Sequence, residues 1–289
     1  MDLFAQLLLS GIANGSHYAM LAIGFGLIFS TTRVTHFAYG PLYALSAYLF
    51  WFFATALHWP LAGAIVVGIL LSAFIGTLTY RFIYQPFQAS NSSDLVILIA
   101  SLGLFIIIEN LVGIVFGTGS RVLDDVAADI YLLGPVVLTS TQVWQVLMLV
   151  LTSLLLALFL HASRFGKAIR AMADNPEMAR IVGIDTRRVS LVVFALGTAI
   201  AAAPALLILV KDGASPYMGF HAVFMAFIAV VVGGVGSLRG AVLGGLILGL
   251  AEGIGLIRIP TEWQSSIAFV VLFIVMLVRP QGLFGRILR

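Results

Sequence analysis

Charged residues are scarce in this sequence, and cysteine is absent. Asp, Glu, Lys and Arg make up only 9% of the 289 residues, whereas hydrophobic residues make up 61%. A soluble globular domain has about a quarter charged residues and roughly half apolar ones, so this composition excludes that class. The lack of cysteine excludes disulfides, thiolate nucleophiles and thiolate metal ligands. We therefore expect a multi-span membrane protein.

Sequence patterns for catalysis are missing as well. The chain has no G-x-x-x-x-G-K-[ST] phosphate loop, no H-E-x-x-H zinc motif and no G-x-S-x-G nucleophile turn. Three of its five histidines, His17, His36 and His221, lack the spacing of metal ligands. No basic run with interleaved aromatic residues indicates nucleic-acid binding. We expect neither an enzyme nor a cofactor or metal in this chain.

Nine apolar segments predict an all-α polytopic bundle in a single transmembrane domain, residues 1–289. If a span and its connection take roughly 30 residues, about eight to ten spans fit. Crossing a ~30 Å hydrocarbon layer takes about 20 residues, and three segments are too short to cross alone, so we expect broken or re-entrant helices. The predicted helices are Leu3–Phe29, Leu42–Leu57, Leu61–Phe82, Leu95–Phe116, Gln142–His161, Ser190–Val210, Ala222–Val232, Val242–Ile257 and Glu262–Val278.

The basic residues predict which side of the membrane each connection faces. Six of the 15 basic residues lie within 164–189, and the tail adds Arg279, Arg286 and Arg289. The connection 117–141 instead carries one basic residue against three acidic ones: Arg121 against Asp124, Asp125 and Asp129. Cytoplasmic connections are enriched in Lys and Arg. The 164–189 loop and the tail are therefore predicted to be cytoplasmic, and the 117–141 connection and the N-terminus external.

The 164–189 loop contains a short predicted helix, Pro176–Val182. Asn175 can cap it, proline suits the first helical position, and Gly183 can adopt the left-handed conformation that ends a helix. Its small apolar face needs a partner. The loop is either a solvated segment on the lipid headgroups or a docking element for a cytosolic subunit. Candidate docking residues are Arg170, Asn175, Pro176, Glu177, Met178, Ile181, Val182 and Gly183.

Two polar, glycine-containing breaks, at 31–41 and 233–240, interrupt the apolar pattern in the two halves of the chain. Paired interruptions indicate a transport path, since unwound backbone is tolerated at depth only within protein or beside water. The alternative is that both are tight turns at the membrane surface. Candidate path residues are His36, Phe37, Tyr39, Gly40, Gly233, Gly234, Gly236 and Ser237.

A few isolated residues stand out within the apolar segments. Glu109 and Glu252 should face the protein interior, a cavity or a basic partner such as Arg258, because an ionised carboxylate in lipid is costly. Small-xxx-small spacing, as in Gly11-x-x-x-Gly15, is most simply close helix packing. A stand-alone proton-coupled carrier of small polar solutes would use Glu109, Glu252 or a histidine.

An ordered set of motifs resembles the permease subunits of the branched-chain amino-acid ABC transporter family. The resemblance runs nearly end to end. It includes Asn14-Gly15-Ser16 with Tyr18-Ala19, Phe37-Ala38 with Gly40, Arg164-Phe165-Gly166, Arg170-Ala171, Gly183-Ile184, Phe227 with Gly233-Gly234-Val235-Gly236-Ser237, Gly240-Ala241, Gly244-Gly245, Glu252 and Arg279-Pro280-Gln281-Gly282-Leu283-Phe284-Gly285.

This resemblance implies a permease subunit of an ATP-driven importer in the cell inner membrane, for branched-chain or other apolar amino acids. It implies as partners a similar second permease, two cytoplasmic ATP-binding subunits that hold ATP and Mg, and an extracytoplasmic binding protein. Where the family usually reads N-F-A-H-G, this chain has His36-Phe37-Ala38-Tyr39-Gly40. Related permeases carry urea, short amides or aromatic acids, so these substrates are an alternative.

Overall fold

The computed structural model describes residues 2–123, 129–133 and 136–285. Within this part of the chain, eight helices are long and apolar enough to cross a membrane, which confirms the predicted polytopic helical bundle. Those helical stretches are Leu3–Thr32, Leu61–Ala89, Asp94–Phe116, Ser140–Ala162, Thr186–Lys211, Pro216–Gly233, Leu238–Gly255 and Thr261–Val278.

The elements follow one another as α1 (Asp2–Thr32), α2 (Tyr39–Trp51), the π-helix η1 (Phe52–Ala56), α3 (Leu61–Thr79), the π-helix η2 (Tyr80–Tyr84), α4 (Gln85–Ala89), α5 (Asp94–Phe116), β1 (Ile130–Leu133), β2 (Val136–Thr139), α6 (Ser140–Ala162), α7 (Arg164–Asp174), α8 (Pro176–Ile181), α9 (Thr186–Lys211), the 3-10 helix η3 (Pro216–Met218), α10 (Gly219–Gly233), α11 (Leu238–Gly255), the 3-10 helix η4 (Thr261–Trp263) and α12 (Gln264–Val278).

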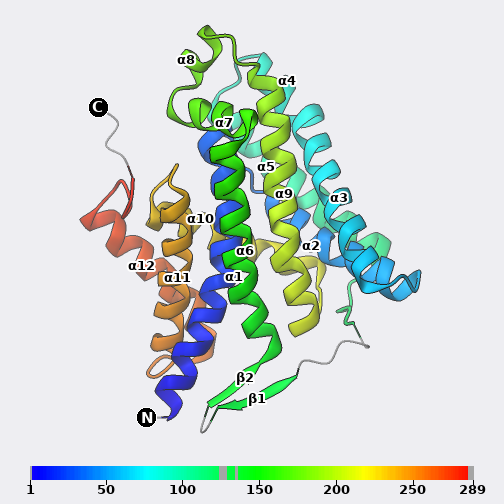
Figure 1. Cartoon of the computed structure of the whole chain (residues 1–289), viewed down its shortest axis with the longest axis vertical. Coiled ribbons are helices and arrows are strands. Elements are labelled where there is room, and N and C mark those ends of the chain that lie inside the picture. Colours follow the sequence, from blue (N-terminus) through cyan, green and yellow to red (C-terminus); the bar gives the residue numbers. More distant parts are fainter. Residues whose placement is uncertain (1, 124–128, 134–135, 286–289) are drawn as a thin grey trace.

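The helices run between two ends of the molecule (Figure 1). The start of α1 and the β1–β2 hairpin lie at one end, and α7 and α8 lie at the other. The connection 117–141 and the 164–189 loop are thus at opposite ends, as the charge pattern predicted. Of the charges behind that prediction, Asp124, Asp125, Arg286 and Arg289 lie outside the described residues.

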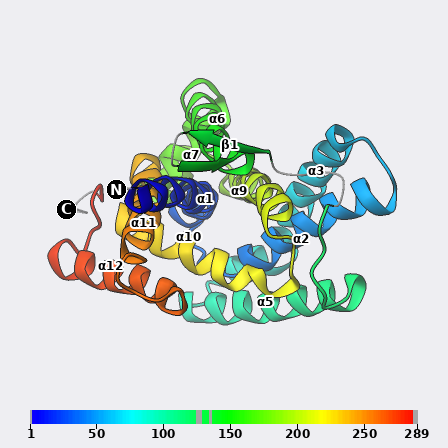
Figure 2. The same cartoon turned by 90° about the horizontal axis from the view of Figure 1, so that it is seen from below.

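Helix α1 lies among α6, α9, α10 and α11 (Figure 2). Its contact with α11 is close because glycines meet there. A Cβ on Gly11 would lie 2.9 Å from the carbonyl oxygen of Gly249, and one on Gly15 would lie 2.9 Å from Cα of Leu246. Only glycine lets the backbones approach this far. The predicted packing role of the Gly11-x-x-x-Gly15 face is therefore confirmed.

The break after α1 turns back into the bundle. Arg33 adopts a positive φ of 59°, and the following segment to Ala38 is largely buried. Helix α2 then begins inside the protein, where the Tyr39 hydroxyl donates to the Leu21 carbonyl (3.1 Å) of α1. This backbone is buried within protein, which satisfies the condition for irregular structure at membrane depth.

Helix α10 also begins inside the bundle, at the first turn of α2. A Cβ on Gly40 would overlap the carbonyl of Gly219, and a Cβ on Gly219 would overlap that of Gly40. The start of α10 therefore meets the end of the first break, at Gly40. The prediction Ala222–Val232 was too short, because Pro216 opens η3 and Gly219 continues helically from it.

The short helix in the 164–189 loop has the predicted caps. The Asn175 side chain accepts from the backbone N–H groups of Glu177 and Met178 at 3.1 and 3.0 Å. Gly183 has φ 87°, in the left-handed region. The helix ends one residue earlier than predicted, at Ile181, with Val182 as its C-cap. Because both caps are local, the sequence alone sufficed to place this element.

The β1–β2 hairpin was not predicted. It is antiparallel, with Ile130 opposite Thr139 and Leu133 opposite Val136. Gln6 of α1 holds it in place, since its amide donates to the Val137 carbonyl and accepts from the Val137 N–H, both at 2.9 Å. The sequence feature that could have predicted the hairpin is the pair of branched apolar runs on either side of Gly134-Pro135.

Candidate functional site

Of the candidate path residues, His36 is fully buried in a polar cluster. Its Nδ1 lies 2.8 Å from the Tyr84 hydroxyl, which donates to Ser101 Oγ at 2.9 Å. Ser101 Oγ also accepts from the Ala38 N–H at 3.3 Å. The tautomer of His36 decides whether Nδ1 or the Tyr84 hydroxyl donates in this contact. The other ring nitrogen of His36, Nε2, has no hydrogen-bond partner among the described residues.

This cluster joins the break to two other elements. Tyr84 ends the π-helix η2, and Ser101 lies on α5. A π-helical turn rotates the side chains that follow it relative to an α-helix and is common at functional sites. The sequence analysis missed Tyr84 and Ser101. A hydroxyl within an apolar segment gives only a weak signal, because it can also bond to its own helix.

The other candidate residues of the first break differ in how exposed their side chains are. Tyr39 is fully buried, and Gly40 is packed against Gly219. Phe37 is partly exposed, and its ring centroid lies 6.1 Å from that of Phe227 on α10. Of Phe37, Tyr39 and Gly40, Phe37 is therefore the residue whose side chain a transported molecule could contact in this conformation.

The second break is the turn between α10 and α11, at the α7 end of the molecule. Gly233 packs against Gly240. Gly234, Gly236 and Ser237 line a cavity of about 80 Å³ that Thr31 and Arg170 also reach. The same small cavity is therefore lined by candidate residues of the second break, by Thr31 at the start of the first break and by Arg170 of α7.

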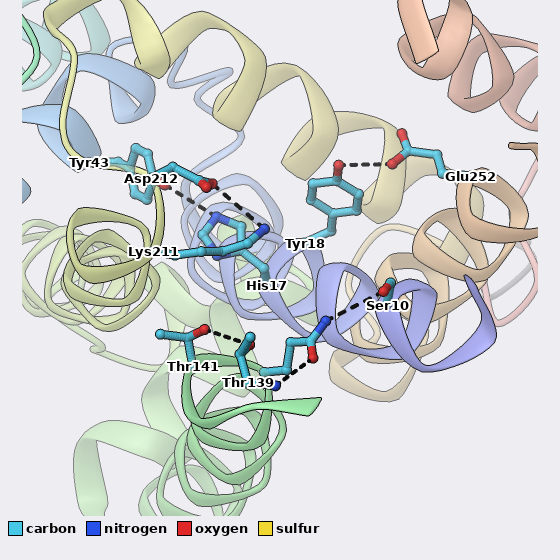
Figure 3. Close-up of polar contacts among 10 residues, drawn as sticks. Ser10, His17, Tyr18, Tyr43, Thr139, Thr141, Lys211, Asp212 and Glu252 are labelled. Carbon is cyan, nitrogen blue, oxygen red and sulfur yellow. Dashed lines mark hydrogen bonds and ion pairs between the residues drawn. The ribbon is translucent and has the colours of Figure 1, made fainter. Parts of the chain in front are cut away.

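A second group of polar contacts surrounds the middle of α1 (Figure 3). His17, the central residue of α1, lies with its Nε2 3.2 Å from the Tyr43 hydroxyl of α2. The next residue, Tyr18, donates to Glu252 Oε2 of α11 at 2.9 Å, and Gln264 Nε2 donates to the same oxygen at 3.1 Å. Adjacent residues of α1 therefore tie it to helices on different sides.

Glu252 is 1% exposed, and no Lys or Arg in the described part of the chain forms an ion pair with it. Arg258, the suggested partner, does not pair with it. Glu252 Oε1 also lacks any hydrogen-bond partner within the described part of the chain. Glu109 is only half-buried, on α5.

Helix α8 presents the apolar face that the sequence predicted. Met178, Ile181 and Val182 are exposed by 55%, 76% and 68%. Glu177 contributes its backbone N–H to the cap, and its side chain is exposed. Arg170 belongs to α7, where its guanidinium lies 3.4 Å from Nδ1 of His161. A rigid, capped helix with an open apolar side is suited to bind another protein.

These features define a class: a polytopic α-helical membrane protein with a buried helix break and a projecting loop helix, as expected of a transport permease. Comparison with known proteins names the family. Residues 7–276 match the family described as branched-chain amino acid transport system / permease component. The chain belongs to this family.

Three relatives match over almost the whole chain. The high-affinity branched-chain amino acid permease LivH of Salmonella typhimurium (strain LT2) is 33% identical, and that of Escherichia coli (strain K12) is 34% identical. The corresponding protein BraD of Pseudomonas aeruginosa is 31% identical. Each alignment covers 98% of this chain and 96% of the relative. As a permease subunit of this family, the chain is a membrane transport protein and not itself an enzyme.

Proposed function

We propose that this chain forms, with a similar second permease, the translocation path of an ATP-driven importer for branched-chain or other apolar amino acids. The observation that carries the proposal is the end-to-end match to permeases named for branched-chain amino acids. A proton-coupled carrier is not favoured by these relatives. Urea, short amides and aromatic acids are weaker candidates for the same reason.

Two cytoplasmic subunits would bind ATP and Mg and hydrolyse ATP, and an extracytoplasmic binding protein would deliver the substrate. The chain lies in the cell inner membrane in this proposal. The α7–α8 end and the tail then face the cytoplasm, in agreement with their excess of basic residues, and the β1–β2 hairpin faces outward.

Helix α8 is the contact for an ATP-binding subunit. Its caps hold it rigid, and its apolar side can enter a cleft of the partner. Force from closure of the ATP-binding subunits then reaches α7 and α9 through a short, stiff element. Arg170, on the preceding helix, lies at the base of this projection and also reaches the cavity beside Ser237.

The test is to change Ile181 to Asp in the assembled importer. A charge placed in a desolvated contact typically costs several kcal/mol if unpaired. Since about 1.4 kcal/mol is tenfold in affinity, binding of the ATP-binding subunit should fall more than a hundredfold. Ile181→Leu is the control and should keep binding. Pull-down and substrate-stimulated ATP hydrolysis in liposomes measure the effect.

Normal coupling in Ile181→Asp would exclude α8 as the docking element. Gly183→Val should give a milder defect of roughly 1 to 2 kcal/mol, because a side chain at φ 87° is strained. Both variants should insert normally, since α8 lies outside the candidate spans. Failure of the wild-type importer to take up leucine, isoleucine or valine would refute the proposed substrate class.

A further inference from the structure

Helix α10 is an inner helix with one open side. Of its span, 61% of the residues are buried, against 22% for the α3 span, 17% for α5 and α6, and 11% for α12. Apart from Met218, the residues that stay accessible recur at helical spacing and so share one face: Tyr217, Phe220, His221, Phe224, Phe227 and Val231. Tyr217 and Phe220 are 55% and 58% exposed.

Three phenylalanines on this face, together with Phe37 of the first break, form what we call the aromatic stripe: Phe37, Phe220, Phe224 and Phe227. Ring centroids of Phe220 and Phe224 are 5.4 Å apart, and those of Phe227 and Phe37 are 6.1 Å apart. The stripe starts one residue after Gly219, where α2 and α10 meet, and continues toward the α7 end of the bundle.

The stripe is flanked by α5 on one side and α12 on the other, as Figure 2 shows for the three helices. Phe105 of α5 lies 6.2 Å from Phe220, and Phe269 of α12 lies 5.2 Å from Phe224, between ring centroids. The open side of α10 is thus bordered by aromatic rings from both neighbours.

Lipid is a poor partner for this face. The exposed imidazole of His221 lies at its edge, 6.1 Å from the Tyr18 ring, and a histidine within a span faces protein or water. The exposed sides of the outer helices α5 and α6 are mostly aliphatic, and they include Ile114, 79% exposed, and Leu154, 63% exposed.

We propose that the aromatic stripe is one wall of the translocation path and contacts the apolar side chain of the amino acid. This inference rests on the proposed function. Phenylalanine rings offer no conventional hydrogen-bond donor or acceptor, so they favour an aliphatic side chain and leave the carboxylate group to water. Each ring contributes only weak dispersion contacts, which allows the substrate to move on along the stripe.

The absence of native cysteine makes accessibility the direct test. Phe220→Cys and Phe224→Cys, in the importer assembled with its partner subunits, should react with a charged, membrane-impermeant methanethiosulfonate. Leucine, delivered under ATP turnover, should slow the reaction. Ile114→Cys and Leu154→Cys are the lipid-facing controls and should not react.

Two results would overturn the assignment. Reaction of the stripe cysteines only with a lipid-soluble maleimide would mean that the stripe faces lipid. Efficient cross-linking of both cysteines to the second permease by a short bifunctional reagent, without aqueous modification, would mean that the stripe is a closed subunit interface.

Selectivity gives an independent measurement. Phe224→Ala removes the central ring, so the ratio of leucine to alanine uptake should fall about tenfold, the usual scale for a lost apolar contact. Phe224→Leu is the control and should retain most of the ratio.

An unchanged ratio in a Phe224→Ala importer that still transports would refute the stripe while leaving the proposed function standing. If the wild type imports no amino acid, the proposed function fails, and cysteine accessibility still decides where the stripe faces.

Discussion

Tyr18 and Glu252, 234 residues apart in the sequence, meet through a buried hydrogen bond of 2.9 Å between α1 and α11. Gln264, just before the apolar run of α12, donates to the same carboxyl oxygen. One carboxyl therefore holds three helices together, without a cationic partner in the described part of the chain.

Glu252→Ala should lower stability by about 1 to 3 kcal/mol, because the Tyr18 hydroxyl and the Gln264 amide lose their acceptor in a buried site. Glu252→Gln keeps an acceptor oxygen and removes a potential charge, so it should match or exceed the wild type. Thermal unfolding in detergent measures both. Uptake by Glu252→Gln should persist when the proton gradient is collapsed. Loss of uptake under this condition would instead favour a proton-coupled carrier.

Tyr84→Phe should loosen the first break. The change removes the bonds from the Tyr84 oxygen to His36 and Ser101 and leaves buried polar atoms unpaired, at a cost of about 1 to 3 kcal/mol. Tyr131→Phe is the matched control, since Tyr131 is 50% exposed on β1. Unfolding temperature and initial uptake rate are the measurements. Equal effects of the two changes would show that the His36 cluster does not hold the break.

Single cysteines test the sidedness of the membrane protein. Glu177→Cys on α8 should react with an impermeant maleimide only after spheroplasts are opened, whereas Tyr131→Cys on β1 should react in intact spheroplasts. Both side chains are exposed, so access to the reagent depends on the compartment. The reverse pattern would place α8 outside the cell and contradict the positive-inside assignment.

The sequence by itself determined the membrane class and the local elements. Scarce charges and long apolar segments require helices in a bilayer, since lipid leaves no solvent for unpaired backbone groups. The caps of α8 join residues two or three positions apart, so Asn175 and Gly183 could be identified before any fold was known.

Only the tertiary structure decided which side of each helix faces inward. Lipid and protein interior are both apolar, so helices such as α10, in which His221 is the one polar side chain, lack the periodicity that marks a buried face in water. The Tyr18–Glu252 bond, the Gly40–Gly219 contact and the aromatic stripe join residues far apart in the chain. Such contacts depend on how whole helices pack, and no local pattern of residues encodes them.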